Sequence, residues 1–335
     1  MELLVGFVLV SVAGIFQGSF ILPMTMTKNW QWEHSWITFS ILGMIVLNWI
    51  LTLIFIPNIF WIYQDLPPGT LRTLILFALG WGTGAVLFGI GMDKLGMSLG
   101  YPIIMGLVAS MGALIPFLIF HSADVLTMKG LLLGIGTILV IIGIIICTKA
   151  GSLKHGNAEK KRIDRKDSFL AGLLISIGAG ILCSFPNIGF SFGSGIIDRA
   201  VESGVPASLA GNAIWALFFT VGSTINIGYC MFLIIRNKNT GQFWSNMSFR
   251  NIQWGLIMAV LWIVSFYVYG VSTAKLGNLG NVIGWPLFMS ISIIAGNLWG
   301  VWKGEWKGAT VKSKRYLKLG IFVLIIAIVV IASGN

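Results

Sequence analysis

The chain has 335 residues, of which 56% are hydrophobic and 10% are charged, and its formal net charge is +11. So few charged residues cannot cover the surface of a water-soluble protein of this length, which excludes a separate soluble domain. In a membrane protein the basic excess reflects where the charges lie along the chain, so it does not indicate nucleic-acid binding.

Ten apolar stretches separated by short polar gaps predict ten membrane-spanning helices. A run of about 20 residues at ~1.5 Å per residue crosses a hydrocarbon core of ~30 Å. These runs are continuous rather than alternating, which favours helices over the strands of a barrel. The sequence therefore predicts an all-α integral membrane protein. The expected spans are residues 3–24, 36–56, 71–92, 97–121, 129–149, 168–197, 206–235, 251–274, 278–301 and 316–333.

The basic residues predict the orientation of the chain. Eighteen of the 22 lysines and arginines fall in the first, third, fifth, seventh and ninth gaps between the spans. Short loops rich in Lys and Arg stay on the cytoplasmic side of a membrane. We therefore expect these gaps to be cytoplasmic and both chain termini to lie outside the cytoplasm. The basic residues of the opposite side are Arg72, Lys129, Arg199 and Lys275.

The longest polar gap divides the spans five and five. This predicts a first five-helix repeat at residues 1–149, a basic cytoplasmic linker at 150–167 and a second five-helix repeat at 168–335. Because each half has an odd number of spans, the second half begins on the opposite side of the membrane. If the halves are homologous, they form an inverted repeat.

Short sequence matches support a common origin of the two halves. Each half has a glycine five residues before a Lys-Leu-Gly element that joins its third span to its fourth, and an aromatic-Pro pair soon afterwards. The matched elements are Gly89 with Lys94-Leu95-Gly96 and Tyr101-Pro102, and Gly270 with Lys275-Leu276-Gly277 and Trp285-Pro286.

The fifth span of each half differs from the others. Residues 131–147 and 319–332 are almost only Leu, Ile, Val and Gly, so they suit lipid-facing positions or a homodimer interface. The polar pathway is expected between the other eight spans. Pro102, Pro186 and Pro286 are expected to break three of those helices, which would free carbonyl groups at a site between the two halves.

The ionisable residues limit the chemistry. All eleven acids and all three histidines lie at span ends or in loops. Proton-coupled carriers commonly use a carboxylate or histidine inside the membrane, and the acids we consider for coupling are Asp93, Asp198 and Glu202. For each, a solvated loop carboxylate is the better explanation. Enzyme motifs are absent and the three cysteines lack metal-ligand spacing, so we expect free thiols, no enzyme, no cofactor and no metal.

Amides and aromatic residues inside the spans indicate a neutral polar substrate, since an organic ion would normally meet a charge inside the membrane. Amides offer donors and acceptors to hydroxyl groups, and aromatic faces cover the C–H surface of a sugar ring. Each amide is also explained by a hydrogen bond between helices, worth roughly 1 kcal/mol, and each tryptophan by packing. The expected substrate-binding residues are Gln17, Trp81, Tyr101, Asn187, Asn212, Trp215, Asn281 and Trp285.

Three segments carry a resemblance to a known family. They are Lys28-x-Trp30-x-Trp32-Glu33 after the first span, Lys94-Leu95-Gly96-Met97-Ser98-x-Gly100 between the third and fourth, and Lys303-Gly304-Glu305-Trp306 after the ninth. With the length and the ten spans, they make the whole chain similar to the L-rhamnose–proton symporter family of the drug/metabolite transporter superfamily. The resemblance implies uptake of L-rhamnose or a related deoxy sugar across the bacterial inner membrane, with a proton moving the same way, by alternating access.

The sequence departs from the family pattern at two places. Asn281 stands where the resemblance implies an acid ahead of the tryptophan, here Trp285, and Phe16-Gln17-Gly18-Ser19 replaces a stretch of small residues. Protons remain the first coupling ion because the resemblance implies them; Na⁺ bound by broken-helix carbonyls, or no coupled ion, are the alternatives. Because fold does not determine function, an exporter or facilitator of another small neutral metabolite and a non-transporting sugar sensor also remain open.

Overall fold

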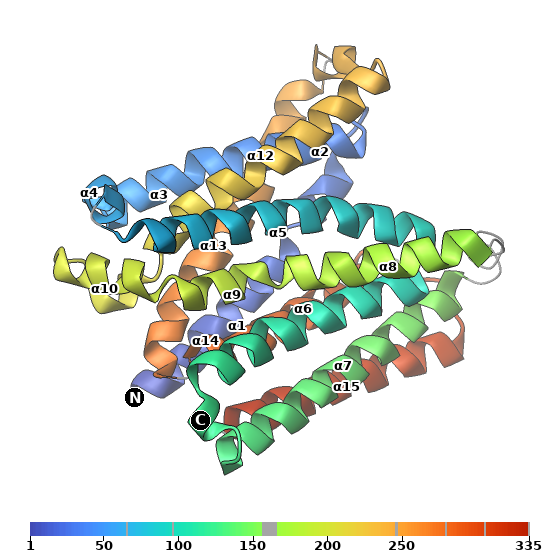
Figure 1. Ribbon diagram of the computed structural model, residues 1–335. Helices are drawn as coiled ribbons and strands as arrows, with labels where there is room; N and C mark the ends of the chain where they lie inside the picture. Colours follow the sequence, from blue (N-terminus) through green and yellow to red (C-terminus); the bar gives the residue numbers. More distant parts are fainter. Residues whose placement is uncertain are drawn as a thin grey trace.

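The computed structural model describes residues 1–64, 66–95, 97–155, 166–244, 247–278, 280–304 and 306–333. Ten of its helical segments are long and apolar enough to cross a membrane. The described residues form helices and no strand, which confirms the predicted all-α membrane fold (Figure 1).

Each half of the chain supplies five of the ten spans. The first half comprises α1 (Glu2–Ser19), η1 (Leu22–Met26), α2 (Trp32–Phe39), η2 (Ser40–Leu47), α3 (Asn48–Phe55), α4 (Ile59–Gln64), α5 (Pro68–Leu95), α6 (Met97–Phe120), η3 (Ser122–Asp124) and α7 (Met128–His155). The second half comprises α8 (Lys166–Cys183), α9 (Phe185–Phe192), α10 (Ser194–Glu202), α11 (Ala207–Ala210), α12 (Ala213–Arg236), η6 (Thr240–Trp244), α13 (Ser248–Leu276), α14 (Gly280–Trp302) and α15 (Val311–Ser333).

The predicted helix breaks are correct at one proline and wrong at two. Pro186 lies in the first turn of α9, directly after the chain interrupts the sixth span at Ser184. Pro286 lies inside the continuous helix α14, and α6 runs through position 102 in the same way. Both of these prolines lie within the first two turns of their helices. A proline beyond the first turn removes one backbone hydrogen bond and can kink a helix without ending it.

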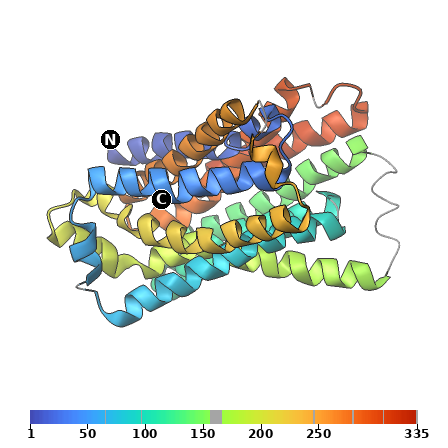
Figure 2. The ribbon, with the colours of Figure 1, turned by 90° about the horizontal axis from the view of Figure 1, so that it is seen from above.

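The ends of the bundle carry different loops. Both termini lie at the end that carries α4 and α10, whereas α7 ends and α8 begins at the opposite end (Figures 1 and 2). This second end also holds the segments between α1 and α2 and between α12 and α13, which carry Lys28 and Lys238. We call it the basic end and the other the terminal end.

Helices of one half pack mainly on helices of the other. The first helix, α1, packs against α13 and α14, and its counterpart α8 packs against α5 and α6. In the same reciprocal way, α2 and η2 contact α13, while α12 contacts α5. The two apolar helices α7 and α15 run side by side at one edge (Figure 1). An exchange of the two halves would preserve this set of contacts.

Two glycine contacts show the same correspondence between the halves at the level of single residues. A Cβ atom on Gly43 would lie 3.2 Å from the Cα of Ala259, and one on Gly222 would lie 3.0 Å from the carbonyl oxygen of Ala78. Ala78 and Ala259 are separated by 181 residues, the separation that also relates Gly89 to Gly270. These contacts support the inverted repeat. The inverted repeat and the limits of the two repeats remain predictions from the sequence.

Replacing Gly82 with alanine is expected to destabilise the contact between α5 and α12. A Cβ atom there would lie 2.4 Å from the carbonyl oxygen of Gly222, so the helices must separate, at a typical cost of about 1–3 kcal/mol. The melting temperature of the detergent-solubilised protein should fall. Gly89→Ala is the matched control, because it lies on the same helix with open space around it. Equal melting temperatures for the two variants would contradict the close contact.

Candidate functional site

A cavity of about 880 Å³ lies between the two halves. Its volume falls within the ~300–1,000 Å³ typical of small-molecule sites. Its walls come mainly from α1, α2, α5, α6, α13 and α14, and Thr25, Gly151 and Trp306 line it towards the basic end. Cys147, Thr148 and Gly151 belong to α7, so the expectation that the fifth span stays out of the pathway is wrong: the end of α7 at the basic end reaches the cavity. No residue of α4, α10 or α11, the helices of the terminal end, lines this cavity.

Two tryptophans form an aromatic wall of the cavity. Trp81 from α5 and Trp262 from α13 stack with ring centroids 6.0 Å apart and an interplanar angle of 19°. Both line the cavity, and neither indole N–H bonds to a residue that the structure describes. A flat aromatic surface of this kind covers the C–H face of a sugar ring, and a free indole N–H can donate to a hydroxyl group.

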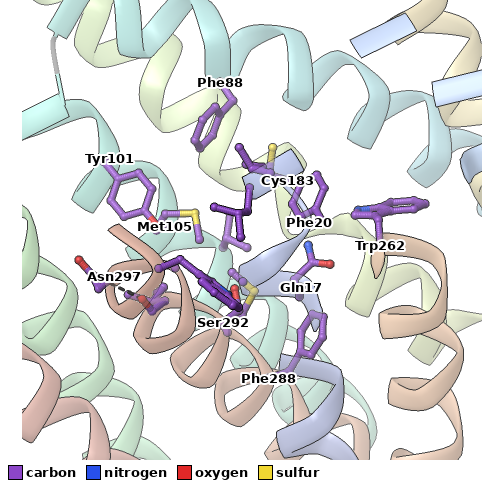
Figure 3. A pocket seen from close by; sticks show the side chains of 18 of the residues that line it. Gln17, Phe20, Phe88, Tyr101, Met105, Cys183, Trp262, Phe288, Ser292 and Asn297 are labelled. Carbon is purple, nitrogen blue, oxygen red and sulfur yellow. Dashed lines mark hydrogen bonds between the residues drawn. The ribbon is translucent and has the colours of Figure 1, made fainter. Parts of the chain in front are cut away.

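Three polar side chains surround the same space. Gln17 of α1, Tyr101 of α6 and Asn297 of α14 face the cavity from different helices (Figure 3). The Oε1 atom of Gln17 lies 2.8 Å from the hydroxyl of Ser265, which leaves the other end of the amide unbonded. Asn297 donates to the carbonyl oxygen of Ile293 in its own helix at 2.8 Å, so its Oδ1 atom keeps its acceptor capacity.

The lining of the cavity carries no formal charge. None of its residues is Asp, Glu, His, Lys or Arg. The described residues also contain no group of three His, Cys, Asp or Glu side chains placed to bind a metal ion. A site of amides, hydroxyls and aromatic rings can bind a neutral polyhydroxylated molecule, whereas an organic ion would meet no opposite charge here.

A buried hydrogen-bond network closes the terminal side of the cavity. The amide nitrogen of Asn187 donates to the carbonyl oxygens of Gly112 at 2.7 Å and Asn281 at 2.9 Å. Its amide oxygen accepts a 2.6 Å hydrogen bond from Tyr269. The side chain of Asn281 donates to the hydroxyl of Ser191. This network joins α9 to α6, α13 and α14 across the two halves, and we call it the terminal-side seal.

Trp285 contributes to both the cavity and its closure. Its ring lines the cavity and contacts Tyr269 of the terminal-side seal at a centroid distance of 5.8 Å. Its indole nitrogen donates to the carbonyl oxygen of Val108 in α6 at 2.9 Å. Because this N–H is already bonded, Trp285 offers a substrate its ring face alone.

Asn212 and Trp215 lie away from the cavity. Both are buried in the terminal half of the bundle, and neither the Asn212 amide nor the Trp215 indole N–H bonds to any described residue. The Oδ1 atom of Asn212 lies against the backbone of Gly270, and the Trp215 ring stacks on Phe219 at 5.1 Å. Of the eight residues expected to bind substrate, the structure therefore gathers four at the cavity and four elsewhere, and substrate contact stays a prediction for each.

Sequence reasoning did not select Trp262. Its position gives a usable signal, because Trp81 and Trp262 are separated by 181 residues, the same separation as Gly89 and Gly270. Asn297 is a polar residue within a span, but nothing in the sequence distinguishes it from an amide that only joins helices. The carbonyl oxygens of Gly112 and Val108 carry no sequence signal, since every residue has one.

Replacing Asn187 with alanine is expected to weaken the terminal-side seal and lower the melting temperature. The change leaves the Tyr269 hydroxyl and the carbonyls of Gly112 and Asn281 without this partner, and each buried unsatisfied group costs about 1–3 kcal/mol. The control is Asn297→Ala, which removes a hydrogen bond within one helix and should change the melting temperature less. The role of the seal would be contradicted if the control lowered the melting temperature as much.

Ten membrane-spanning helices around an uncharged cavity, sealed at one end and reaching the other, are the architecture of a membrane transporter. Residues 2–335 match the family model described as L-rhamnose-proton symport protein. The chain belongs to this family.

Relatives with the same description match this chain along nearly their whole length. The L-rhamnose-proton symporter of Citrobacter koseri is 28% identical over 323 residues, which cover 94% of this chain and 93% of the relative. The L-rhamnose-proton symporters of Escherichia coli and Shigella dysenteriae are 26% identical over 324 residues, with the same coverage. The family model spans both halves and includes the residues of the cavity and of the terminal-side seal.

Proposed function

We propose that the protein takes up L-rhamnose or a closely related deoxy sugar by alternating access, with protons as the coupling ion. The family and the names of the relatives support this substrate and this ion. The observation that carries the proposal is the cavity, which combines a two-tryptophan wall with amide and hydroxyl groups and lacks charged residues. Cys147 and Cys183 line the cavity, but no Asp, Glu, His or Lys accompanies them as a general base, so the lining favours transport over catalysis.

We infer the orientation from the basic residues. If the basic end faces the cytoplasm of a bacterial inner membrane, both termini lie outside the cytoplasm, and the cavity of this structure reaches the cytoplasmic side. The terminal-side seal then separates the substrate site from the outside. The structure would thus correspond to the state that releases sugar into the cell, and an opposite state would have to open the seal.

The coupling group is proposed to lie outside the cavity, because the cavity lining has no carboxylate or imidazole. Among the edge acids considered from the sequence, Glu202 pairs with Arg199 at 2.9 Å in α10, and Asp198 lies in the same short helix. The side chain of Asp93 lies outside the described residues. Position 281, inside the seal, is the point where a titratable group would have the most direct effect on opening.

The proposal is tested by counterflow of labelled L-rhamnose in proteoliposomes. Liposomes are loaded with unlabelled L-rhamnose, and entry of the label is compared with empty liposomes and with protein inactivated by heat. Counterflow needs no ion gradient, so a folded carrier should exchange the sugar whatever its coupling. We expect uptake that saturates and that excess unlabelled L-rhamnose suppresses.

Each failure has a distinct meaning. If folded protein shows no counterflow of L-rhamnose but binds it, as measured by a shift in melting temperature, the sensor alternative is favoured. If it neither binds nor exchanges the sugar, the substrate proposal is wrong. A panel of L-rhamnose, L-fucose, D-mannose and glycerol then separates a deoxy-sugar carrier from a general facilitator of neutral metabolites.

A further inference from the structure

The two halves carry a repeated pattern in the helices that face each other across the cavity. Residues 100–112 of α6 and 284–296 of α14 match at a constant separation of 184 residues. The matched positions are Gly100 with Gly284, Tyr101 with Trp285, Pro102 with Pro286, Met105 with Met289 and Gly112 with Gly296. Each helix therefore has an aromatic residue three turns before a glycine.

On the terminal side, the aromatic residue of one helix sits on the glycine of the other. A Cβ atom on Gly112 would lie 2.2 Å from the indole nitrogen of Trp285. The same nitrogen donates to the carbonyl oxygen of Val108, one turn earlier in α6. This close contact needs a residue without a side chain at position 112, and it brings α14 against α6 beside the terminal-side seal.

The equivalent contact on the basic side is open. A Cβ atom on Gly296 would have only the carbonyl oxygen of Gly18 within 4 Å, at 3.6 Å. Tyr101 and Gly296 both line the cavity, and the Tyr101 hydroxyl bonds to no residue that the structure describes. The same pair of residue types is therefore in contact at the closed side and apart at the open side.

We propose that Trp285 and Tyr101 are the two lids of this cavity. Trp285 seated on Gly112 closes the terminal side in this structure, and Tyr101 seats on Gly296 to close the basic side in the opposite state. This inference rests on the alternating access of the proposed function, and it identifies the residues that close each side of the cavity in turn. Between the lids, Trp81 and Trp262 occupy matched positions in the two halves and stack on each other, so their wall faces the cavity in both states.

The proposal is tested by cross-linking pairs of cysteines that lie in different halves. The background has Cys147, Cys183 and Cys230, which are unpaired, replaced by alanine, and a protease site inserted between residues 156 and 165. One pair is Trp285→Cys with Gly112→Cys; removing the indole makes room for the new Cβ. The second pair is Tyr101→Cys with Gly296→Cys. After treatment with a short bis-methanethiosulfonate reagent and proteolysis, halves that stay together on a denaturing gel are cross-linked.

We expect both pairs to cross-link, because the carrier samples both states, and each cross-link to lower L-rhamnose counterflow at least tenfold relative to the same cysteine variant after reduction. The matched control is Tyr101→Cys with Leu298→Cys. Leu298 lies two residues beyond Gly296 on an exposed face of α14, so this pair should not cross-link.

The proposal is overturned if the Tyr101/Gly296 pair cross-links no more than the control, or if its cross-link leaves counterflow unchanged. The gel is read without sugar, so it decides whether the two lids close even if L-rhamnose is the wrong substrate. Absence of counterflow in the wild-type protein would count against the proposed function alone.

Discussion

Replacing Trp81 with alanine is expected to lower L-rhamnose counterflow at least 100-fold. The change removes half of the stacked aromatic wall that the cavity offers to the C–H face of a sugar ring. A contact worth ~3 kcal/mol corresponds to about 100-fold in affinity. The measurement is the initial rate of counterflow over a range of sugar concentrations, with protein amounts equalised by gel.

The same substitution can also harm folding, because Trp81 is partly buried and truncation of a fully buried aromatic residue costs about 3–5 kcal/mol. A second pair of variants separates the two effects. Trp81→Phe keeps an aromatic face, whereas Trp81→Leu fills similar space without one, so phenylalanine should retain at least ten times more counterflow than leucine. Trp302→Ala, at an exposed tryptophan near the end of α14, is the control for loss of any tryptophan. Equal rates for Trp81→Phe and Trp81→Leu would show that the aromatic face does not bind the sugar.

The sequence predicted the spans well because long apolar runs have few alternatives in a membrane. Gln17, Trp81 and Tyr101 do meet at the cavity, but the expectation that the fifth span takes no part was wrong, because the end of α7 also lines the cavity. Two of the three expected helix breaks were wrong. A proline removes one backbone hydrogen bond, which can kink a helix without ending it.

The role of individual amides could not be predicted, because it depends on which carbonyl oxygens lie within reach. Asn187 resembles Gln17 in sequence, because each lies next to a residue that disturbs helices: Gln17 precedes Gly18, and Asn187 follows Pro186. In the structure Gln17 faces the cavity, whereas the amide nitrogen of Asn187 donates to the carbonyl oxygens of Gly112 and Asn281 and is not available to a substrate. The state of the transporter matters as well: Trp285 closes the terminal side here, and its contacts would change when that side opens.

The hydrogen bonds of the terminal-side seal suggest how the amide at position 281 affects the free energy of opening the terminal side. Asn281 donates its side-chain N–H to Ser191, and its backbone carbonyl accepts hydrogen bonds from Asn187 and Tyr269. A group at this position stabilises the closed terminal side only while it can donate a hydrogen bond. An amide donates at every pH, but a carboxyl group donates only when it is protonated.

Replacing Asn281 with aspartate is therefore expected to make uptake depend strongly on a pH gradient. A protonated Asp at this position can donate to Ser191 and keep the terminal side closed, as the amide does. The ionised form loses that donor and places a charge among buried groups, which is costly and favours opening towards the terminal side, where water reaches it. Protonation from outside would then return the carrier to the state of this structure, with its cavity reaching the basic end.

We measure L-rhamnose uptake with the outside one pH unit more acidic than the inside. This gradient is expected to increase uptake by Asn281→Asp several-fold more than uptake by the wild-type protein. Uptake is measured in proteoliposomes with the external pH varied at constant internal pH, and a protonophore should abolish the difference. Asn297→Asp is the matched control, since it places a carboxyl group on the same helix but in the cavity wall instead of the seal. An unchanged pH profile in Asn281→Asp, or an equal change in Asn297→Asp, would show that proton coupling does not depend on position 281.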